Sequence, residues 1–232
     1  MNARNVVTRE AWLQARLTLL AQEKAFTRAR EELAQTRRQL PWVKVEEAYE
    51  FATESGLCDL SQLFEGRSQL VVQHFMYGAD WQEGCKSCSF WADNLQGAIT
   101  HLQARDVSYV AVSQAPLSVI LPFKQRMGWQ MNWVSSAQSN FSNDFHVWYT
   151  PEQIAAGATF YNYTEGLHYG EHSPGFSVFI TEDDVIYHTY SCYARGLDML
   201  NGTYQLLDLV PKGRAESDLP ANMAWVRLHD QY

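Results

Sequence analysis

The sequence predicts an α/β fold, a mixed β-sheet flanked by helices, preceded by an N-terminal helical arm. Three observations predict it. Strand and helix patterns alternate over residues 69–127, two strand patterns at 176–191 flank the short acidic turn Thr181–Asp184, and residues 8–39 carry only helix-forming chemistry. A strand–helix–strand unit requires parallel pairing through a right-handed crossover, whereas a short turn joins antiparallel strands. Together they predict a mixed sheet.

The arm, residues 1–40, is predicted to be helical because residues 8–39 lack Gly and Pro and are rich in Ala, Leu, Glu, Gln and Arg. Thr8 is the expected N-cap, and Pro41 ends the segment. Apolar residues recur at helical spacing at Leu13, Leu17 and Leu20. One long helix or two shorter ones fit equally. The arm either packs on its own domain or joins two copies; we expect a homodimer.

The second predicted domain covers residues 41–232. Its expected strands are 69–75, 107–113, 133–136, 176–180 and 185–191, with a strand-like tail at 224–229. Its expected helices are 91–102, 117–127 and 197–207, and 137–173 is expected to be an inserted loop region. The first of these strands, 69–75, directly precedes the cysteine-containing loop considered below.

Composition and charge exclude several function classes. Hydrophobic residues make up 46% of the 232 residues and the net charge is −8, which suits a globular protein and argues against a general nucleic-acid binder. Residues 1–44 nevertheless carry +5 and the remainder −13. No apolar run approaches the roughly 18 residues that span a bilayer, and no signal-peptide pattern opens the chain, so we expect a cytoplasmic protein without a membrane partner.

The cysteines provide the most specific chemical signal. Cys85 and Cys88 form a CxxC pair between the predicted strand 69–75 and the following helix. At a helix N-terminus the unpaired N–H groups and the dipole favour a thiolate, so Cys85 is the expected nucleophile and Cys88 the resolving thiol. Lys86 would assist this ionisation, while nearby acidic residues would oppose it. Two unreactive thiols, or a zinc site completed by Cys58 and Cys192, are the alternatives.

This order of hydrophobic strand, CxxC, helix and a later Pro before a hairpin resembles thioredoxin and the thiol-reductase relatives of the peroxiredoxins. The resemblance implies that Pro174, in Ser173–Pro174–Gly175, lies against the cysteines and follows a cis peptide bond. More narrowly, the chain resembles the bacterial thioredoxin-like family catalogued as domain of unknown function 899. The stretches that carry this likeness are 40–45, 74–81, 83–93, 127–136 and 188–198. The resemblance implies a fold but no settled activity.

The chain departs from the peroxiredoxin pattern. Their Pro-x-x-x-Thr/Ser-x-x-Cys signature is absent, since Gly78 and Gln82 precede Cys85 at those positions, and Trp81 and Cys85 precede Cys88. We therefore discount a peroxiredoxin-type peroxidase but not slow peroxide reduction.

Further site residues are expected around the pair. In thioredoxin an acidic residue in the corresponding strand moves protons beneath the cysteines, and the resemblance assigns this role to His74, although a satisfied core histidine fits equally. The expected substrate-binding residues are Trp81, Lys86, Trp91, Tyr190 and Arg195, with core packing and strand-end capping as alternative roles. Cys192 is expected to be a buried small hydrophobe.

The function expected from these residues is a thiol–disulfide oxidoreductase or thiol-dependent reductase that needs no cofactor. Its partners would be a protein or small-molecule disulfide substrate and a cellular dithiol reductant. A non-catalytic thiol sensor or binding module is the first alternative, suggested by the basic arm. A metal-binding thioredoxin-like protein, using the two cysteines and His188, is the second.

Overall fold

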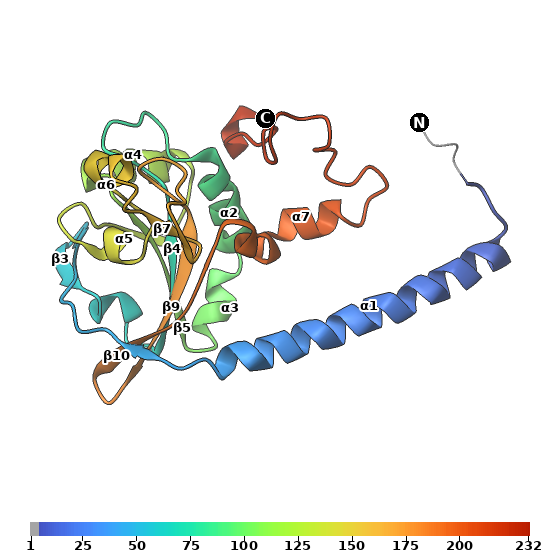
Figure 1. Ribbon diagram of the computed structural model, residues 1–232, viewed down its shortest axis with the longest axis horizontal. Helices are drawn as coiled ribbons and strands as arrows, with labels where there is room; N and C mark the ends of the chain where they lie inside the picture. Colours follow the sequence, from blue (N-terminus) through green and yellow to red (C-terminus); the bar gives the residue numbers. More distant parts are fainter. Residues whose placement is uncertain (1–4) are drawn as a thin grey trace. The chain divides into compact units, whose positions relative to one another are not determined.

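The computed structural model describes residues 5–232, and the chain divides into two compact units, Met1–Pro41 and Trp42–Tyr232 (Figure 1). The first unit is a single helix, α1 (Arg9–Arg38), which favours the one-helix alternative. Thr8 caps it as predicted, because the Ala11 N–H donates to Thr8 Oγ1 at 3.2 Å. The helix ends at Gln39, whose backbone N–H bonds back to the carbonyls of Thr36 and Arg37.

No side chain of α1 is buried. Four large apolar residues lie seven apart along it, and each is at least 45% exposed: Trp12, Leu19, Phe26 and Leu33. Because 3.6 residues make one turn, residues seven apart lie almost on one line along the helix. The helix therefore presents a nearly straight apolar stripe, which we call the heptad stripe.

The second unit is built on an eight-stranded mixed sheet with the order β1-β10-β9-β4-β5-β6-β2-β3. The strands are β1 (Val43–Lys44), β2 (Glu50–Thr53), β3 (Gly56–Asp59), β4 (Gln69–His74), β5 (Val107–Ser113), β6 (Asn132–Ser135), β9 (Gly175–Glu182) and β10 (Val185–Tyr193). β4 pairs in parallel with β5, and β5 with β6, while β9 is antiparallel to both β4 and β10. A small separate hairpin joins β7 (Phe160–Tyr161) and β8 (Thr164–Glu165).

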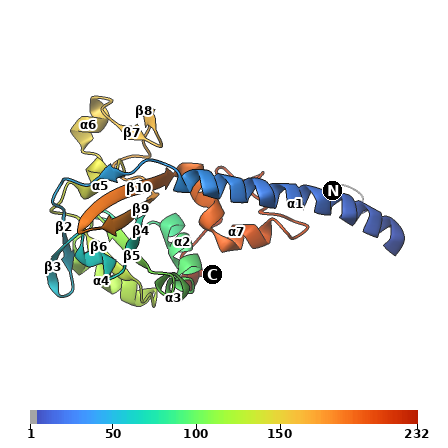
Figure 2. The same ribbon diagram turned by 90° about the horizontal axis from the view of Figure 1, so that it is seen from below.

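Helices cover both faces of this sheet (Figures 1 and 2). The helices of the unit are α2 (Lys86–Gln96), α3 (Ile99–Gln103), α4 (Leu117–Arg126), α5 (Phe141–Asp144), α6 (Pro151–Ala155) and α7 (Gly202–Leu207), with 3₁₀ turns η1 (Gln62–Phe64), η2 (Ala194–Leu200) and η3 (His229–Gln231). One core cluster packs α2, α4 and α7 on the first face, and another packs α5 and η1 on the second. We call these the α2 face and the α5 face.

The architecture confirms the predicted fold class, a mixed β-sheet flanked by helices and preceded by an N-terminal helix. Several elements differ in detail from the expectation. The helix expected over 91–102 breaks at Gly97 and Ala98 into α2 and α3, and the one expected over 197–207 begins as the 3₁₀ turn η2. The tail 224–229 forms no strand: it leaves a turn at residue 225, is irregular over 226–228 and enters η3 at His229. The inserted region 137–173 contains α5, α6 and the small hairpin.

Candidate functional site

Cys85 lies where the chain leaves the central strand β4 and enters α2, for which it is the N-cap. The intervening loop is held in place because the Cys85 N–H donates to Met76 O at 3.1 Å and Ala115 N–H donates to Tyr77 O at 2.8 Å. Gly84 is required by close packing: a Cβ at that position would lie 2.7 Å from Phe123 Cε1. The loop therefore reaches the helix along one tightly packed path.

The two sulfur atoms meet the backbone N–H groups of this turn. Cys85 Sγ accepts the Cys88 N–H at 3.5 Å, and Cys88 Sγ accepts the Met76 N–H at 3.5 Å. Cys85 is partly exposed, whereas Cys88 is only 3% exposed, and neither forms a disulfide in the described chain. One thiol is thus accessible and the other lies one helical turn deeper.

The environment ionises the two thiols differently. A hydrogen bond from the Cys88 thiol is the main reason that the pKa of Cys85 falls to about 7, with burial opposing and N–H groups of Cys88 and Ser87 assisting. Burial, together with the hydrogen bond and charge of Cys85, raises the pKa of Cys88 well above its ordinary value. From the sequence alone, the direction of the pKa shift of Cys85 is open, because Lys86 and the nearby acidic residues act in opposite directions. In the structure, hydrogen bonding to Cys85 is the main cause that lowers this pKa.

The residue beneath the cysteines is Gln73, which the sequence analysis missed. Gln73 is 2% exposed, its Nε2 donates to Cys88 O at 3.0 Å, and its Oε1 accepts the Tyr109 hydroxyl. Both polar ends are therefore satisfied by the core. Gln73 positions the first turn of α2 and has no titratable proton.

His74, expected beneath the pair, lies on the opposite face. Successive strand residues point to opposite faces, so His74 projects to the α5 face beside Phe141 and Phe145, with ring centroids 5.6 and 5.8 Å away. Its Nε2 pairs with Ser177 Oγ at 2.7 Å, and burial lowers its pKa to about 3. His74 is thus a neutral core residue, which corrects the proton-transfer role.

Pro174 directly precedes β9, and Gly175 pairs with His74 at the end of β4 from which the cysteine loop departs. Pro174 therefore lies at the same end of the paired strands β4 and β9 as that loop. Its peptide bond is trans, as are all peptide bonds in the described chain, so the cis bond implied by the resemblance is wrong. Hydrogen bonds fix the segment as it stands: the Ser173 N–H donates to Val147 O and the Tyr161 hydroxyl to Pro174 O, at 2.8 and 2.6 Å.

The predicted substrate-binding residues have different environments. Trp81 is partly buried, and its ring meets His172 edge-on at 5.1 Å. Lys86 is exposed in the first turn of α2, beside Cys85. Tyr190 packs partly buried against the α2-face core. Lys86 is therefore next to the expected nucleophile, whereas Trp81 contacts His172, a residue that no sequence signal singled out.

Trp91 has its alternative role, core packing, whereas the substrate-binding role of Arg195 stays a prediction. Trp91 is buried, and its indole N–H donates to Leu197 O at 2.9 Å, so it is a core residue and presents no surface to a substrate. Arg195 is an exposed residue of η2 that pairs with Asp198 at 3.5 Å. An anion at this position would compete with that carboxylate.

The cysteines do not gather into a metal site. Cys58 is on the edge strand β3, whereas Cys192 is buried in the α2-face core on β10, and the strands β9, β4, β5, β6 and β2 lie between β10 and β3 in the sheet. His188 is in contact with Phe145 and Phe179 on the α5 face. Within residues 5–232, no three His, Cys, Asp or Glu side chains are placed to share a metal ion. The described helices also include none long and apolar enough to cross a membrane.

Comparison with solved structures finds distant likenesses. Peroxidoxin BcpB from Mycobacterium tuberculosis is 15% identical with a TM-score of 0.48, covering 72% of this chain and 97% of that one. A mutant of Xanthomonas campestris peroxiredoxin Q is 11% identical with a TM-score of 0.47, covering 71% and 97%. No curated protein matches. The model of one family, described as "Bacterial protein of unknown function (DUF899)", matches residues 1–232, and the chain belongs to that family.

Proposed function

We propose that this protein is a thiol–disulfide oxidoreductase or thiol-dependent reductase whose redox centre is the Cys85–Cys88 pair. One observation carries the proposal: Cys85 is the N-cap of α2, and its sulfur accepts the Cys88 N–H. This N–H and the Cys88 thiol favour a thiolate at Cys85, whereas the pKa of the buried Cys88 is raised. A thiol with a pKa near 7 is about half ionised at neutral pH, against a few per cent for an ordinary cysteine. That asymmetry is what separates an attacking from a resolving thiol.

The reaction would proceed in two exchanges. The Cys85 thiolate attacks one sulfur of a substrate disulfide, forming a mixed disulfide and expelling the other sulfur as a thiolate that takes up a proton from water. Cys88 then loses its proton to solvent and attacks the Cys85 sulfur, which releases the second substrate thiol and leaves a Cys85–Cys88 disulfide. Two electrons pass to the substrate, and a cellular dithiol, which we place in the reducing cytoplasm, returns them.

The hydrogen bonding explains why Cys88 waits for the first exchange. Two of the three causes that raise its pKa, the hydrogen bond to Cys85 and the charge of Cys85, vanish once Cys85 is in a mixed disulfide. Only burial then opposes ionisation, and the Met76 N–H at 3.5 Å from Cys88 Sγ supports the new thiolate. Resolution is thereby linked to substrate capture.

The experiment that tests this function is turnover with a defined disulfide. Reduced protein should reduce cystine or a disulfide-linked peptide repeatedly when dithiothreitol regenerates it. Cys85→Ser should abolish turnover, and Cys88→Ser should accumulate a mixed disulfide on Cys85 that intact-mass measurement detects. Cys58→Ser, on the distant strand β3, is the matched control and should keep full activity. If the pair oxidises to a stable disulfide but supports no turnover, the result would contradict the enzyme proposal and favour the redox-sensor alternative.

We also propose that the arm joins two copies through the heptad stripe. A single helix gains most of its stability from packing an apolar face, yet α1 runs 30 residues without one buried side chain. Apolar residues repeated every seven positions are the pattern of helices that pair along their length. A second copy carries the same stripe, so symmetry supplies a matching surface.

Light scattering on the full-length protein tests this proposal. We expect a dimer, and Leu19→Glu with Phe26→Glu should convert it to a monomer because two charges would enter the stripe. Gln14→Glu adds a charge to the side of α1 away from the stripe and should leave the dimer intact. A monomeric parent protein, or a dimer unaffected by the double substitution, would contradict the role of the stripe.

A further inference from the structure

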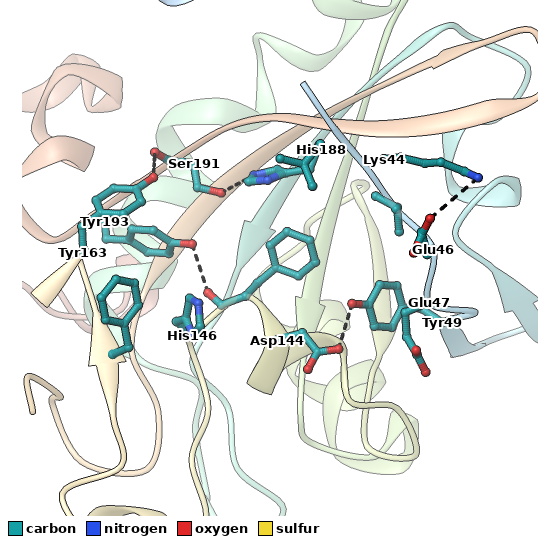
Figure 3. Close-up of a pocket in the computed structure, with 14 residues that line it drawn as sticks. Lys44, Glu46, Glu47, Tyr49, Asp144, His146, Tyr163, His188, Ser191 and Tyr193 are labelled. Atoms are coloured by element: carbon teal, nitrogen blue, oxygen red, sulfur yellow. Dashed lines mark hydrogen bonds and ion pairs between the residues drawn. The ribbon is translucent and has the colours of Figure 1, made fainter. Parts of the chain in front are cut away.

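A second site lies on the α5 face, away from the cysteines. An open pocket of about 300 Å³ is lined by β1 and the residues after it, the turn after α5, the β7–β8 hairpin and β10. Figure 3 shows His188 and Ser191 on its β10 side, with Tyr49, Asp144 and His146 across from them. This volume is at the lower limit of pockets that bind small organic ligands.

The β10 side of the pocket is fixed by a buried chain of hydrogen bonds. His74 Nε2 pairs with Ser177 Oγ, Ser177 Oγ with Ser191 Oγ, and Ser191 Oγ with His188 Nε2, each at 2.7 Å. His74, Ser177 and Ser191 are all at least 96% buried. A chain of this kind holds His188 in one orientation before any ligand arrives.

The hydroxyl groups of three tyrosines in the pocket already donate hydrogen bonds to protein acceptors. The Tyr193 hydroxyl donates to Phe145 O at 3.0 Å, Tyr163 to Ser191 O at 2.9 Å and Tyr49 to Asp144 Oδ2 at 2.8 Å. These groups can still accept hydrogen bonds through their lone pairs. A ligand must therefore supply donors of its own.

The charge of the lining also favours a donor. Glu46, Glu47 and Asp144 carry three negative charges against the single positive charge of Lys44, whose Nζ lies 3.9 Å from Glu46. Burial lowers the pKa values of His146 and His188, so both rings are neutral at pH 7 and add no positive charge. Burial first, and then Asp144 and Glu47, raise the pKa of Tyr49, which reports the negative field inside the pocket.

His146 is the residue whose hydrogen-bonding capacity is unused. Its φ of +59° is a left-handed backbone conformation that only a minority of non-glycine residues adopt, and such residues cluster at ligand-binding positions. Its ring packs edge-on against Phe160 at 5.0 Å, and no described side chain or backbone group hydrogen-bonds to its nitrogens. One ring nitrogen of a neutral histidine is an acceptor.

We infer that this pocket binds a small organic cation, an amine on an apolar body. Its ammonium protons would meet Asp144, Glu47 and the free nitrogen of His146. Its body would pack on Phe145, Phe160 and the tyrosine rings, whose faces also attract a cation. A carboxylic acid or phosphate of the same size would be repelled by the carboxylates. Because neither Cys85 nor Cys88 lines this pocket, the inference does not depend on the proposed redox function.

A nuclear magnetic resonance titration of the full chain with 2-phenylethylamine tests the inference, with phenylacetate as the anionic analogue of the same body. The amine should shift the signals of pocket residues saturably, and phenylacetate should bind at least tenfold more weakly. Removing one exposed carboxylate by Asp144→Asn or Glu47→Gln should weaken amine binding about three- to fivefold. The side-chain amide that Asp144→Asn introduces keeps an oxygen for the Tyr49 hydroxyl.

Glu165→Gln is the control, since it removes a carboxylate from strand β8 of the neighbouring hairpin, outside the lining. It should leave amine affinity unchanged. Phenylacetate binding as tightly as the amine, no saturable shift by the amine up to its solubility limit, or unchanged amine affinity in both pocket variants would each overturn the inference.

Discussion

The hydrogen bond from the Cys88 thiol should set the reactivity of Cys85, and replacing Cys88 by Ala tests this directly. The substitution removes the Sγ–H donor but keeps the backbone N–H at position 88, which lies 3.5 Å from Cys85 Sγ. The thiol hydrogen bond is the largest cause that lowers the pKa of Cys85 to about 7. The variant should therefore move this pKa towards its ordinary value.

The size of the change follows from the energy of such bonds. A hydrogen bond to a charged group contributes about 1.5–3 kcal/mol, and one pKa unit corresponds to about 1.4 kcal/mol. We therefore expect the pKa of Cys85 to rise by about 1–2 units in Cys88→Ala. In Cys88→Ser, whose hydroxyl can still donate, the pKa should rise by less.

Alkylation by iodoacetamide as a function of pH, followed by peptide mass spectrometry at Cys85, measures this pKa. At pH 7 a rise of about 1–2 units lowers the thiolate fraction of Cys85 from about one half to about 0.1–0.01, so its alkylation rate should fall about five- to fiftyfold in Cys88→Ala. Cys58→Ala is the control and should leave the midpoint unchanged. A midpoint near 8.5 in the parent protein, or the same midpoint in parent and Cys88→Ala, would refute the assignment of the pKa shift to this hydrogen bond.

Three other predictions follow from the packing. His74→Asn should leave the alkylation midpoint of Cys85 unchanged because His74 lies on the other face; a shift would restore it to the mechanism. Because burial lowers the folded-state pKa of His74 to about 3, the unfolded chain binds its proton first as the pH falls below about 6.5. Urea unfolding should show stability falling by up to about 1.4 kcal/mol per pH unit from there, and more gently in His74→Asn; equal slopes would contradict the neutral core assignment. Gly84→Ala should cost about 1–3 kcal/mol in the same assay by displacing the Phe123 ring, whereas Gly97→Ala, with open space around it, should cost nothing; equal stabilities would exclude the close-packing explanation.

The sequence predicts the centre of the fold better than its edges. The strands at 69–75 and 107–113 and the hairpin at 176–191 are recognisable because buried central strands carry long runs of β-branched and aromatic residues. The strands β1 and β3 at the sheet edges, and β2 next to β3, have two to four residues each, too few to show a period. They escape prediction for that reason.

The site was only half predictable. The position of Cys85 at a helix start follows from the order of elements, but the face on which Gln73 and His74 lie does not. Gln69–His74 is buried on both faces, so it lacks the alternation of polar and apolar residues that would orient a one-sided strand. The amine pocket escapes for another reason: its walls come from segments around residues 45, 145, 160 and 190, which only the folded chain brings together.

If Cys85 and Cys88 form a working dithiol pair, the pair has a measurable reduction potential in the range of dithiol enzymes. Protein equilibrated in graded dithiothreitol buffers would be quenched with acid and its thiols counted by mass spectrometry. We expect a reversible two-electron couple between about −300 and −120 mV, the range of dithiol enzymes. A pair that forms no disulfide even in oxidising buffer would contradict the account.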